Sequence, residues 1–140
     1  MTFVLVELED LDALGRVAVS GSGPSKADLD RGWNESFLGM YFWVRTGTNA
    51  DGATTLRTRM IERTIEDPAT GSAASDLAAY LSLADEKQET VFDYAITQGV
   101  EMGRRSDINL RVVVGGSGVE RIILGGSAIP VMQGRLTVED

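Results

Sequence analysis

The segment that most constrains the fold is a run of small and apolar residues over 72–84, SAASDLAAYLSLA. Alanine and leucine occupy most of it, and its clearly polar positions are only Ser72, Ser75, Asp76 and Ser82. A helix this apolar is usually buried on all sides. Small side chains also let strands approach the helix axis closely. The segment therefore predicts one sheet folded round one central helix.

Strand patterns stand before and after this helix in the chain. Apolar or alternating stretches rich in β-branched and aromatic residues are typical of strands. They occur at 3–7, 37–46, 54–62, 90–97, 107–114 and 119–124, and two further short strands are expected around Gly134. Short helices are expected near Gly15 and at 26–32. This pattern predicts an α+β chain rich in antiparallel neighbours, and no linker divides 1–140 into two domains.

The charge balance disfavours several kinds of partner. Thirteen basic residues stand against twenty-one acidic ones, which gives a formal net charge of −8. No cluster of Lys or Arg is present to neutralise phosphates, so no nucleic-acid partner is expected. The acidity also disfavours an anionic membrane surface, and no apolar run reaches membrane-spanning length. The opening MTFVLVELED matches neither a signal peptide nor a transit peptide, so we expect a cytoplasmic protein.

The absence of histidine and cysteine limits the chemistry. The chain can have no disulfide, no cysteine nucleophile, no Ser-His-Asp triad and no zinc site built on His or Cys. Glu9, Asp10 and Asp12 stand together but lack the alternating spacing and the glycine of a calcium loop. Proton chemistry must therefore use Asp, Glu, Lys, Tyr or water. We expect no metal and no cofactor.

Candidate functional residues gather where the central helix begins, in the stretch EDPATGSAA that starts at Glu66. Thr70 or Ser72 is placed to cap the helix. Gly71 allows a positive φ or the close approach of a ligand to the backbone. The free N–H groups of a first helical turn, with the positive end of the helix dipole, suit a carboxylate or phosphate, and Asp67 lies beside them. Helix capping alone is the competing interpretation of the same residues.

Read as a string, EDPATGSAA resembles the signature of the PhzF-like isomerase family of phenazine biosynthesis, which has the diaminopimelate-epimerase fold. Other stretches resemble further motifs of that family in the same order. They are Arg59-Met60, ITQGVEMGRRSDINLRV at 96–112 and GGSAIPVMQGRL at 125–136. The order of the motifs places the whole chain as the second half of such a protein, and the variant is most similar to those of fungi.

The resemblance implies both a fold and a site. Family members have two similar domains, with the active site in the cleft between them. For this chain the resemblance implies a diaminopimelate-epimerase-like single domain over 1–140, with a curved mixed or antiparallel sheet wrapped around one central apolar helix. Asp67 matches the catalytic aspartate of the second half. Gly71 and Ser72 match groups that hold a substrate carboxylate, and Thr70 is a further candidate for substrate contact.

A later block of residues matches the family mainly as architecture: Gln98, Gly99, Met102, Gly103, Arg104 and Ser106. Within it, Arg104 is expected to pair with a carboxylate of the protein. Other features depart from the family pattern. Family enzymes are roughly twice as long, and their principal general acid/base is a first-half glutamate that has no counterpart here. Ala74 stands where many members have histidine.

Three roles are open to a chain that supplies half of such a cleft. The first is an isomerase or epimerase acting on a small carboxylate-bearing metabolite by cofactor-independent proton transfer, or by a cyclisation started by it. A second copy, in a homodimer, or a separate first-half protein would then complete the cleft. The second is a module that binds small anions or regulates a full-length relative. The third is a truncated product without an independent role. We expect the first.

The second role requires an apolar surface patch where the missing domain would sit. Its candidates are the aromatic residues Trp33, Phe37, Tyr41, Phe42 and Trp43. Packing in the core is the alternative expectation for the same side chains.

Overall fold

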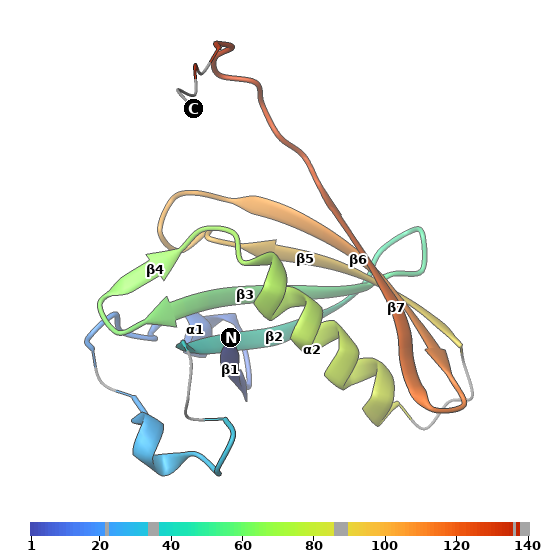
Figure 1. The fold of residues 1–140 in the computed structure, drawn as a ribbon, viewed down its shortest axis with the longest axis horizontal. Helices are drawn as coiled ribbons and strands as arrows, with labels where there is room; N and C mark the ends of the chain where they lie inside the picture. Colours follow the sequence, from blue (N-terminus) through green and yellow to red (C-terminus); the bar gives the residue numbers. More distant parts are fainter. Residues whose placement is uncertain (22, 34–36, 86–89, 136, 138–140) are drawn as a thin grey trace.

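The structure, a computed structural model, describes residues 1–21, 23–33, 37–85, 90–135 and 137. Seven strands form one sheet that curls around the long helix α2 (Gly71–Ala84) (Figure 1). The strands are β1 (Thr2–Glu7), β2 (Leu38–Thr48), β3 (Thr54–Glu62), β4 (Ile65–Asp67), β5 (Val91–Gln98), β6 (Ser106–Gly115) and β7 (Gly118–Gly126). The shorter helical segments are α1 (Leu11–Gly15) and the single 3-10 turn η1 (Lys26–Asp28).

The strand order explains where the central helix begins. The sheet runs β1-β2-β3-β5-β6-β7, and β4 pairs with β3 beside this path. β1 is parallel to β2 and β3 is parallel to β5, whereas the other neighbours are antiparallel. Parallel neighbours need a crossover connection. The chain therefore leaves β3 through β4, crosses the sheet in α2 and returns in β5, so that α2 starts directly after β4.

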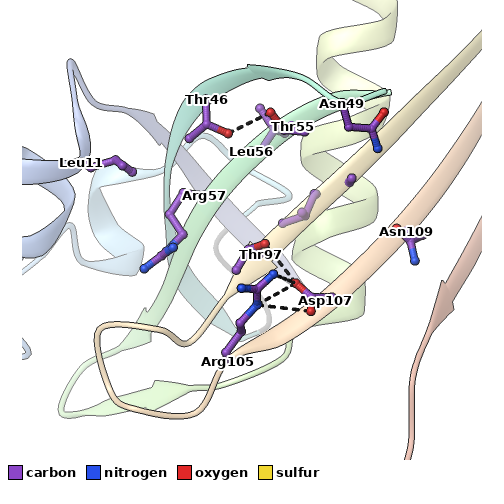
Figure 2. Close-up of a pocket in the computed structure, with 12 residues that line it drawn as sticks. Leu11, Thr46, Asn49, Thr55, Leu56, Arg57, Thr97, Arg105, Asp107 and Asn109 are labelled. Carbon is purple, nitrogen blue, oxygen red and sulfur yellow. Dashed lines mark hydrogen bonds and ion pairs between the residues drawn. The ribbon is translucent and has the colours of Figure 1, made fainter. Parts of the chain in front are cut away.

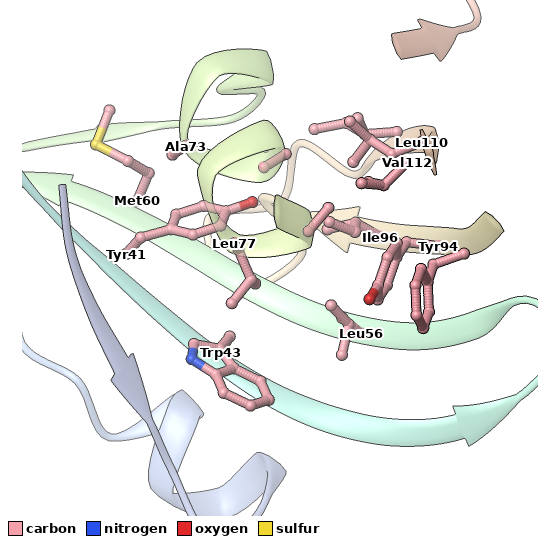
Figure 3. Packing of buried hydrophobic residues seen from close by; sticks show 14 residues of the cluster. Tyr41, Trp43, Leu56, Met60, Ala73, Leu77, Tyr94, Ile96, Leu110 and Val112 are labelled. Carbon is pink, nitrogen blue, oxygen red and sulfur yellow. The ribbon is translucent and has the colours of Figure 1, made fainter. Parts of the chain in front are cut away.

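The core forms between α2 and the concave face of the sheet. Ala73, Ala74, Leu77 and Ala78 are completely buried. Figure 3 shows large side chains of the strands around this helix, among them Tyr41 of β2. Because the helix contributes mostly methyl groups, strands as far apart in the sheet as β1 and β7 both reach it. The predicted α+β fold, a curved mixed sheet around one apolar helix, is confirmed.

One stripe of the central helix stays open to solvent. Tyr80 and Leu83 are each 56% exposed, and Asp76 lies on the same side. The expectation that the helix would be buried on all sides is therefore wrong for this stripe. The physical reason is that the curled sheet covers the helix from one side only (Figure 1).

Some expected elements are shorter or absent. The helix expected at 26–32 is only the η1 turn, which the Asp28 carboxylate closes by accepting from the Ser25 backbone N–H and hydroxyl. Of the two strands expected around Gly134, the one before it is wrong, since residues 127–135 contain no strand, and the one after it falls mostly on residues that lie outside the described part of the chain. This segment continues from the edge strand β7 and runs away from the sheet (Figure 1). Among the described residues no strand lies beside it to pair with.

The aromatic candidates for a surface patch divide between core and surface. Tyr41 and Trp43 are buried at 0% and 3% exposure, so the core expectation is confirmed for them. Phe37 and Phe42 are partly buried, and only Trp33 is largely exposed. In the described part of the chain, no helix combines the length and the apolar character that a bilayer span requires.

The requirement for small residues on α2 can be tested by enlarging one of them. We expect Ala74→Leu to lower the free energy of unfolding by about 1–3 kcal/mol, because the extra carbons have no space between α2 and the sheet. The matched control is Ala84→Leu, at the exposed last position of the same helix. Urea denaturation measures both variants. Equal stability of the two variants would contradict the close approach of helix and sheet.

Candidate functional site

The turn between β4 and α2 holds the candidate site residues together. We call residues 67–73 the helix mouth. Thr70 is the N-cap residue of α2, and its carbonyl accepts the Ala74 N–H at 3.0 Å. The prediction that the Thr70 or Ser72 side chain caps the helix is wrong, because no side-chain cap bond forms there. The Thr70 hydroxyl instead donates to Asp67 Oδ2 at 2.7 Å.

Asp67 is half-buried at the end of β4, and its two carboxylate oxygens differ in their partners. Oδ2 accepts the short hydrogen bond from the Thr70 hydroxyl at 2.7 Å. Oδ1 accepts only a long one, from the Ala69 N–H at 3.3 Å. The carboxylate is thus oriented by its own turn, and Oδ1 keeps capacity for another donor.

The first turn of α2 presents unpaired donors. In the described part of the structure, the N–H groups of Gly71, Ser72 and Ala73 meet no acceptor. The Thr70 N–H is different, since it donates to Gln98 Oε1 at 3.3 Å. Free N–H groups at the positive end of a helix attract anions. Asp67, Thr70, Gly71 and Ser72 thus lie in one turn of the chain, and their catalytic and substrate-binding roles stay predictions.

Gly71 lies close to a side chain of β7. Its φ is not positive, so of the two roles open to it the positive-φ one does not hold. A Cβ at this position would lie 2.9 Å from Leu124 Cδ1 of β7. The Leu124 side chain, 50% exposed, thus lies against the helix mouth and forms an apolar border to it.

Gln98, the last residue of β5, links this strand to the helix mouth by hydrogen bonds. Its side chain is completely buried. Nε2 donates to the Asp67 carbonyl at 2.7 Å and to the Thr70 hydroxyl oxygen at 3.0 Å. Oε1 accepts from the Thr70 N–H and contacts the Tyr41 hydroxyl at 3.1 Å, and that hydroxyl also lies 3.0 Å from Thr58 Oγ1. A fully partnered buried amide fixes the turn, because an unpaired one would be costly.

The sequence carries a signal for the role of Gln98 in supporting the turn. Phe92, Tyr94 and Ile96 are the core-facing positions of β5, and Gln98 continues the same alternation. A polar side chain at a core-facing position of a strand needs buried hydrogen-bond partners. Its neighbour Gly99 has φ +77, and a Cβ there would lie 2.9 Å from the Pro68 carbonyl oxygen. The Gln-Gly pair therefore supports the turn by an amide and by close backbone contact.

Glu66 serves the fold. Its two oxygens bind the Arg59 Nε and Nη2 groups, each at 2.8 Å, and both side chains are over 90% buried. Arg59 Nη1 also donates to the carbonyls of Leu14 and Val17, which ties the α1 region to β3. Hydrogen bonding to Glu66 raises the pKa of Arg59 above its usual value. With both oxygens occupied, Glu66 is a structural neighbour of Asp67.

Arg104 does not pair as expected. Among the ion pairs of the described residues, none involves Arg104, and its side chain is exposed. Arg104 contributes to the fold through its backbone instead: its N–H donates to the Gly99 carbonyl at 2.8 Å and closes the turn after β5. The neighbouring Arg105 forms the ion pair, with Asp107 at 3.0 Å.

Three hollows of about 350, 410 and 650 Å³ lie away from the helix mouth. Figure 2 shows the first, on the sheet face opposite α2, where Arg105 pairs with Asp107 and Thr46 bonds Thr55. None of the three is lined by Asp67, Thr70, Gly71 or Ser72. Among the described residues, no three acidic side chains gather in a way that would hold a metal ion.

Comparisons with known proteins agree with this architecture. The model of the PhzC-PhzF family, described as phenazine biosynthesis-like protein, matches residues 39–134. The chain belongs to this family. An uncharacterized isomerase of Mesorhizobium japonicum is 32% identical over 140 residues, which cover 97% of this chain and 45% of that protein.

A solved structure shows the same fold at low identity. The phenazine biosynthesis protein of the PhzF family from Bacillus anthracis superposes with a TM-score of 0.59 and 14% identity, covering 86% of this chain and 44% of that one. The resemblance to PhzF-like proteins is thus confirmed, and the fungal-type variant stays a prediction. This PhzC-PhzF family chain spans less than half the length of the relatives it matches.

The Arg59–Glu66 pair gives a prediction for stability. We expect Glu66→Ala to lower the free energy of unfolding by about 3–5 kcal/mol, because it leaves the Arg59 charge buried without a partner. The matched control is Asp93→Ala, which breaks the exposed pair with Arg111 and should cost about 1 kcal/mol or less. Urea denaturation at neutral pH measures both. Similar losses in the two variants would refute the structural role of Glu66.

Tyr41 gives a prediction for pH. Burial raises the pKa of its phenol well above the ordinary value of 10.0, the Thr58 hydrogen bond opposes this, and the Asp67 charge adds to it. Burial also raises the pKa of Tyr94. Above pH 10 the unfolded chain loses the Tyr41 proton while the folded chain keeps it. The stability that Tyr41 contributes is therefore complete below pH 10 and falls above it, by about 1.4 kcal/mol per pH unit, and Tyr94 contributes in the same direction.

Chemical denaturation between pH 9 and 11.5 measures this slope. Tyr41→Phe should make the decline shallower by about one proton's worth of slope, and Tyr94→Phe should also make it shallower, whatever either change does to stability at neutral pH. The control is Tyr80→Phe, because Tyr80 is 56% exposed on α2. A Tyr41→Phe variant with the wild-type slope would show that the Tyr41 phenol ionises in the folded protein.

Proposed function

We propose that this chain forms one wall of an isomerase active site that moves a proton at carbon in a small carboxylate-bearing metabolite, without a cofactor. The observation that carries the proposal is Asp67, oriented beside three unpaired N–H groups at the N-terminus of α2. Membership of the PhzC-PhzF family and the likeness to an uncharacterized isomerase support this class of reaction.

The helix mouth would bind and polarise the substrate. The N–H groups of Gly71 and Ser72 receive the substrate carboxylate, in a position where the helix dipole favours negative charge. When a C–H bond next to the carboxylate or conjugated with it breaks, its electron pair moves toward the bound oxygens. Fixed N–H donors stabilise such developing charge better than mobile water does. The negative charge needed to start proton abstraction comes from Asp67.

Asp67 would act as the acid and base of this transfer. Its carboxylate takes the proton from the substrate carbon, and the resulting carboxylic acid returns a proton to another carbon or to the other face. No electrons leave the system, so no oxidant or reductant is needed. A positioned carboxylate of this kind contributes on the order of 10²–10⁴ in rate.

The site would be completed by a second polypeptide wall. None of the three described hollows is lined by the helix mouth, and the chain covers only 45% of its isomerase relative. The open stripe at Tyr80 and Leu83 and the exposed apolar residues of 127–135 leave surface for such a partner. We propose that the chain is the second half of the family architecture, a single domain paired with a second copy or with a first-half protein.

Replacement of Asp67 tests the proposal. In the assembled protein, Asp67→Asn should lower turnover by about 10²–10⁴-fold, because the amide cannot accept the substrate proton. Turnover is followed by NMR in D₂O, as exchange of C–H for C–D and as new isomers, over a panel of small unsaturated or hydroxylated carboxylic acids. The control is Asp93→Asn, on the outer face of β5. Unchanged exchange with Asp67→Asn would exclude Asp67 as the base.

A further inference from the structure

We infer that Gln98 and Thr70 are positioning residues that keep Asp67 Oδ2 as a hydrogen-bond acceptor and leave Oδ1 as the oxygen that carries the transferred proton. The inference rests on the proposed function of Asp67, but its structural part stands on the hydrogen bonds beneath the helix mouth. It assigns Thr70 to Asp67 rather than to the substrate.

The first step is the orientation of the Gln98 amide. Its Oε1 lies 3.3 Å from the Thr70 N–H, which can only donate, and its Nε2 lies 2.7 Å from the Asp67 carbonyl, which can only accept. A rotated amide would place donor against donor and acceptor against acceptor at both contacts. Two backbone groups therefore fix which end of the amide is nitrogen, and the amide is 0% exposed.

The second step is the direction of the Thr70 hydroxyl. The Gln98 Nε2 group has no lone pair to offer, so at 3.0 Å it donates its second proton to Thr70 Oγ1. The single hydroxyl proton of Thr70 is then free for another acceptor. Asp67 Oδ2, at 2.7 Å, is the acceptor that the described structure provides. The chain of donors runs from Gln98 through Thr70 to Asp67.

The third step is the consequence for Asp67. A proton on Oδ2 would make this oxygen a poorer acceptor for the hydroxyl proton of Thr70, which has no other acceptor among the described residues. A proton on Oδ1 meets no such conflict, since its contact is the long bond from the Ala69 N–H at 3.3 Å. Oδ1 is therefore the oxygen that takes up and releases the proton. The network holds the carboxylate so that Oδ1 stays in a fixed position from which it can face the substrate carbon.

Tyr41, which contacts Gln98 from the core, and Thr58, which contacts Tyr41, are uncharged. Burial raises the pKa of Tyr41, so its phenol stays neutral while it contacts Gln98 Oε1 at 3.1 Å. Thr58, its other contact, is also neutral and completely buried. The groups of this network that orient Asp67 are thus neutral, and they favour the same direction at every pH at which Tyr41 is protonated.

Two changes at Thr70, one that keeps the hydroxyl and one that keeps the shape, separate positioning from packing. In the D₂O assay, Thr70→Ser keeps the hydroxyl and should keep turnover within about threefold, whereas Thr70→Val should lower kcat by about 10–100-fold, the range for a hydrogen bond to a charged group. KM should stay within about threefold in both, because the N–H groups of Gly71 and Ser72 remain. Equal kcat in Thr70→Val and Thr70→Ser would overturn the inference, as would a loss confined to KM.

A measurement without turnover locates the protons directly. Neutron diffraction from perdeuterated crystals should show the Thr70 deuteron directed at Asp67 Oδ2, both Gln98 Nε2 deuterons bonded to the Asp67 carbonyl and Thr70 Oγ1, and, in acid, the carboxyl deuteron on Oδ1. A deuteron on Oδ2, or a reversed Gln98 amide, would refute the inference.

Failure of the inference and failure of the proposed function are distinguishable. If the neutron map shows the expected deuterons while Asp67→Asn keeps full exchange activity, the network orients Asp67 but Asp67 is not the base. If Asp67→Asn is inactive while the deuteron lies on Oδ2, the proposed function stands and the assignment of Oδ1 is wrong.

Discussion

The close approach of the sheet to the central helix is the constraint on which the rest of the structure depends. Ala73, Ala74 and Ala78 are completely buried, so strands can curl around α2 without a layer of large helix side chains between them. That curl brings β5 beneath the start of α2, where Gln98 reaches the turn after β4. A bulkier helix would separate the two and leave a buried amide without partners, which folded proteins avoid. The helix mouth is therefore built by core packing before any chemistry is considered.

Much of this could be predicted from residue patterns, because the patterns report burial. The apolar run at 72–84 predicted a central helix, and the alternating stretches predicted most of the strands around it. What the patterns could not give is which polar atoms meet. Gln98 stood one residue beyond the predicted strand at 90–97, although its alternation with Ile96 placed it on the core face. Its bonds to Asp67 and Thr70 join positions far apart in sequence, and no local rule encodes them.

The errors share a physical cause. Thr70 was expected to cap α2 because a threonine before a helix usually bonds a first-turn N–H, but the nearby Asp67 carboxylate is a stronger acceptor for the same hydroxyl. Arg104 was expected to form an ion pair, yet its backbone, not its side chain, closes the turn after β5. The strand expected before Gly134 is absent because a strand forms only where another strand lies beside it to pair with. In each case the local preference of the residue was overridden, either by a partner elsewhere in the fold or by the lack of one.

The geometry of the helix mouth bears on how such a site would work. Abstraction of a proton from carbon leaves charge that water would solvate and quench, so the reacting groups have to be enclosed. The N–H groups of the first turn of α2 point away from the helix body, as N-terminal donors must, and the Leu124 side chain borders Gly71. Under the proposed function, the chain thus supplies the charge, the donors and the orientation of Asp67, while enclosure comes from whatever covers the mouth. Catalysis would then be a property of the assembly, and the Gln98–Thr70 network would keep one oxygen of Asp67 correctly placed before the partner wall closes over it.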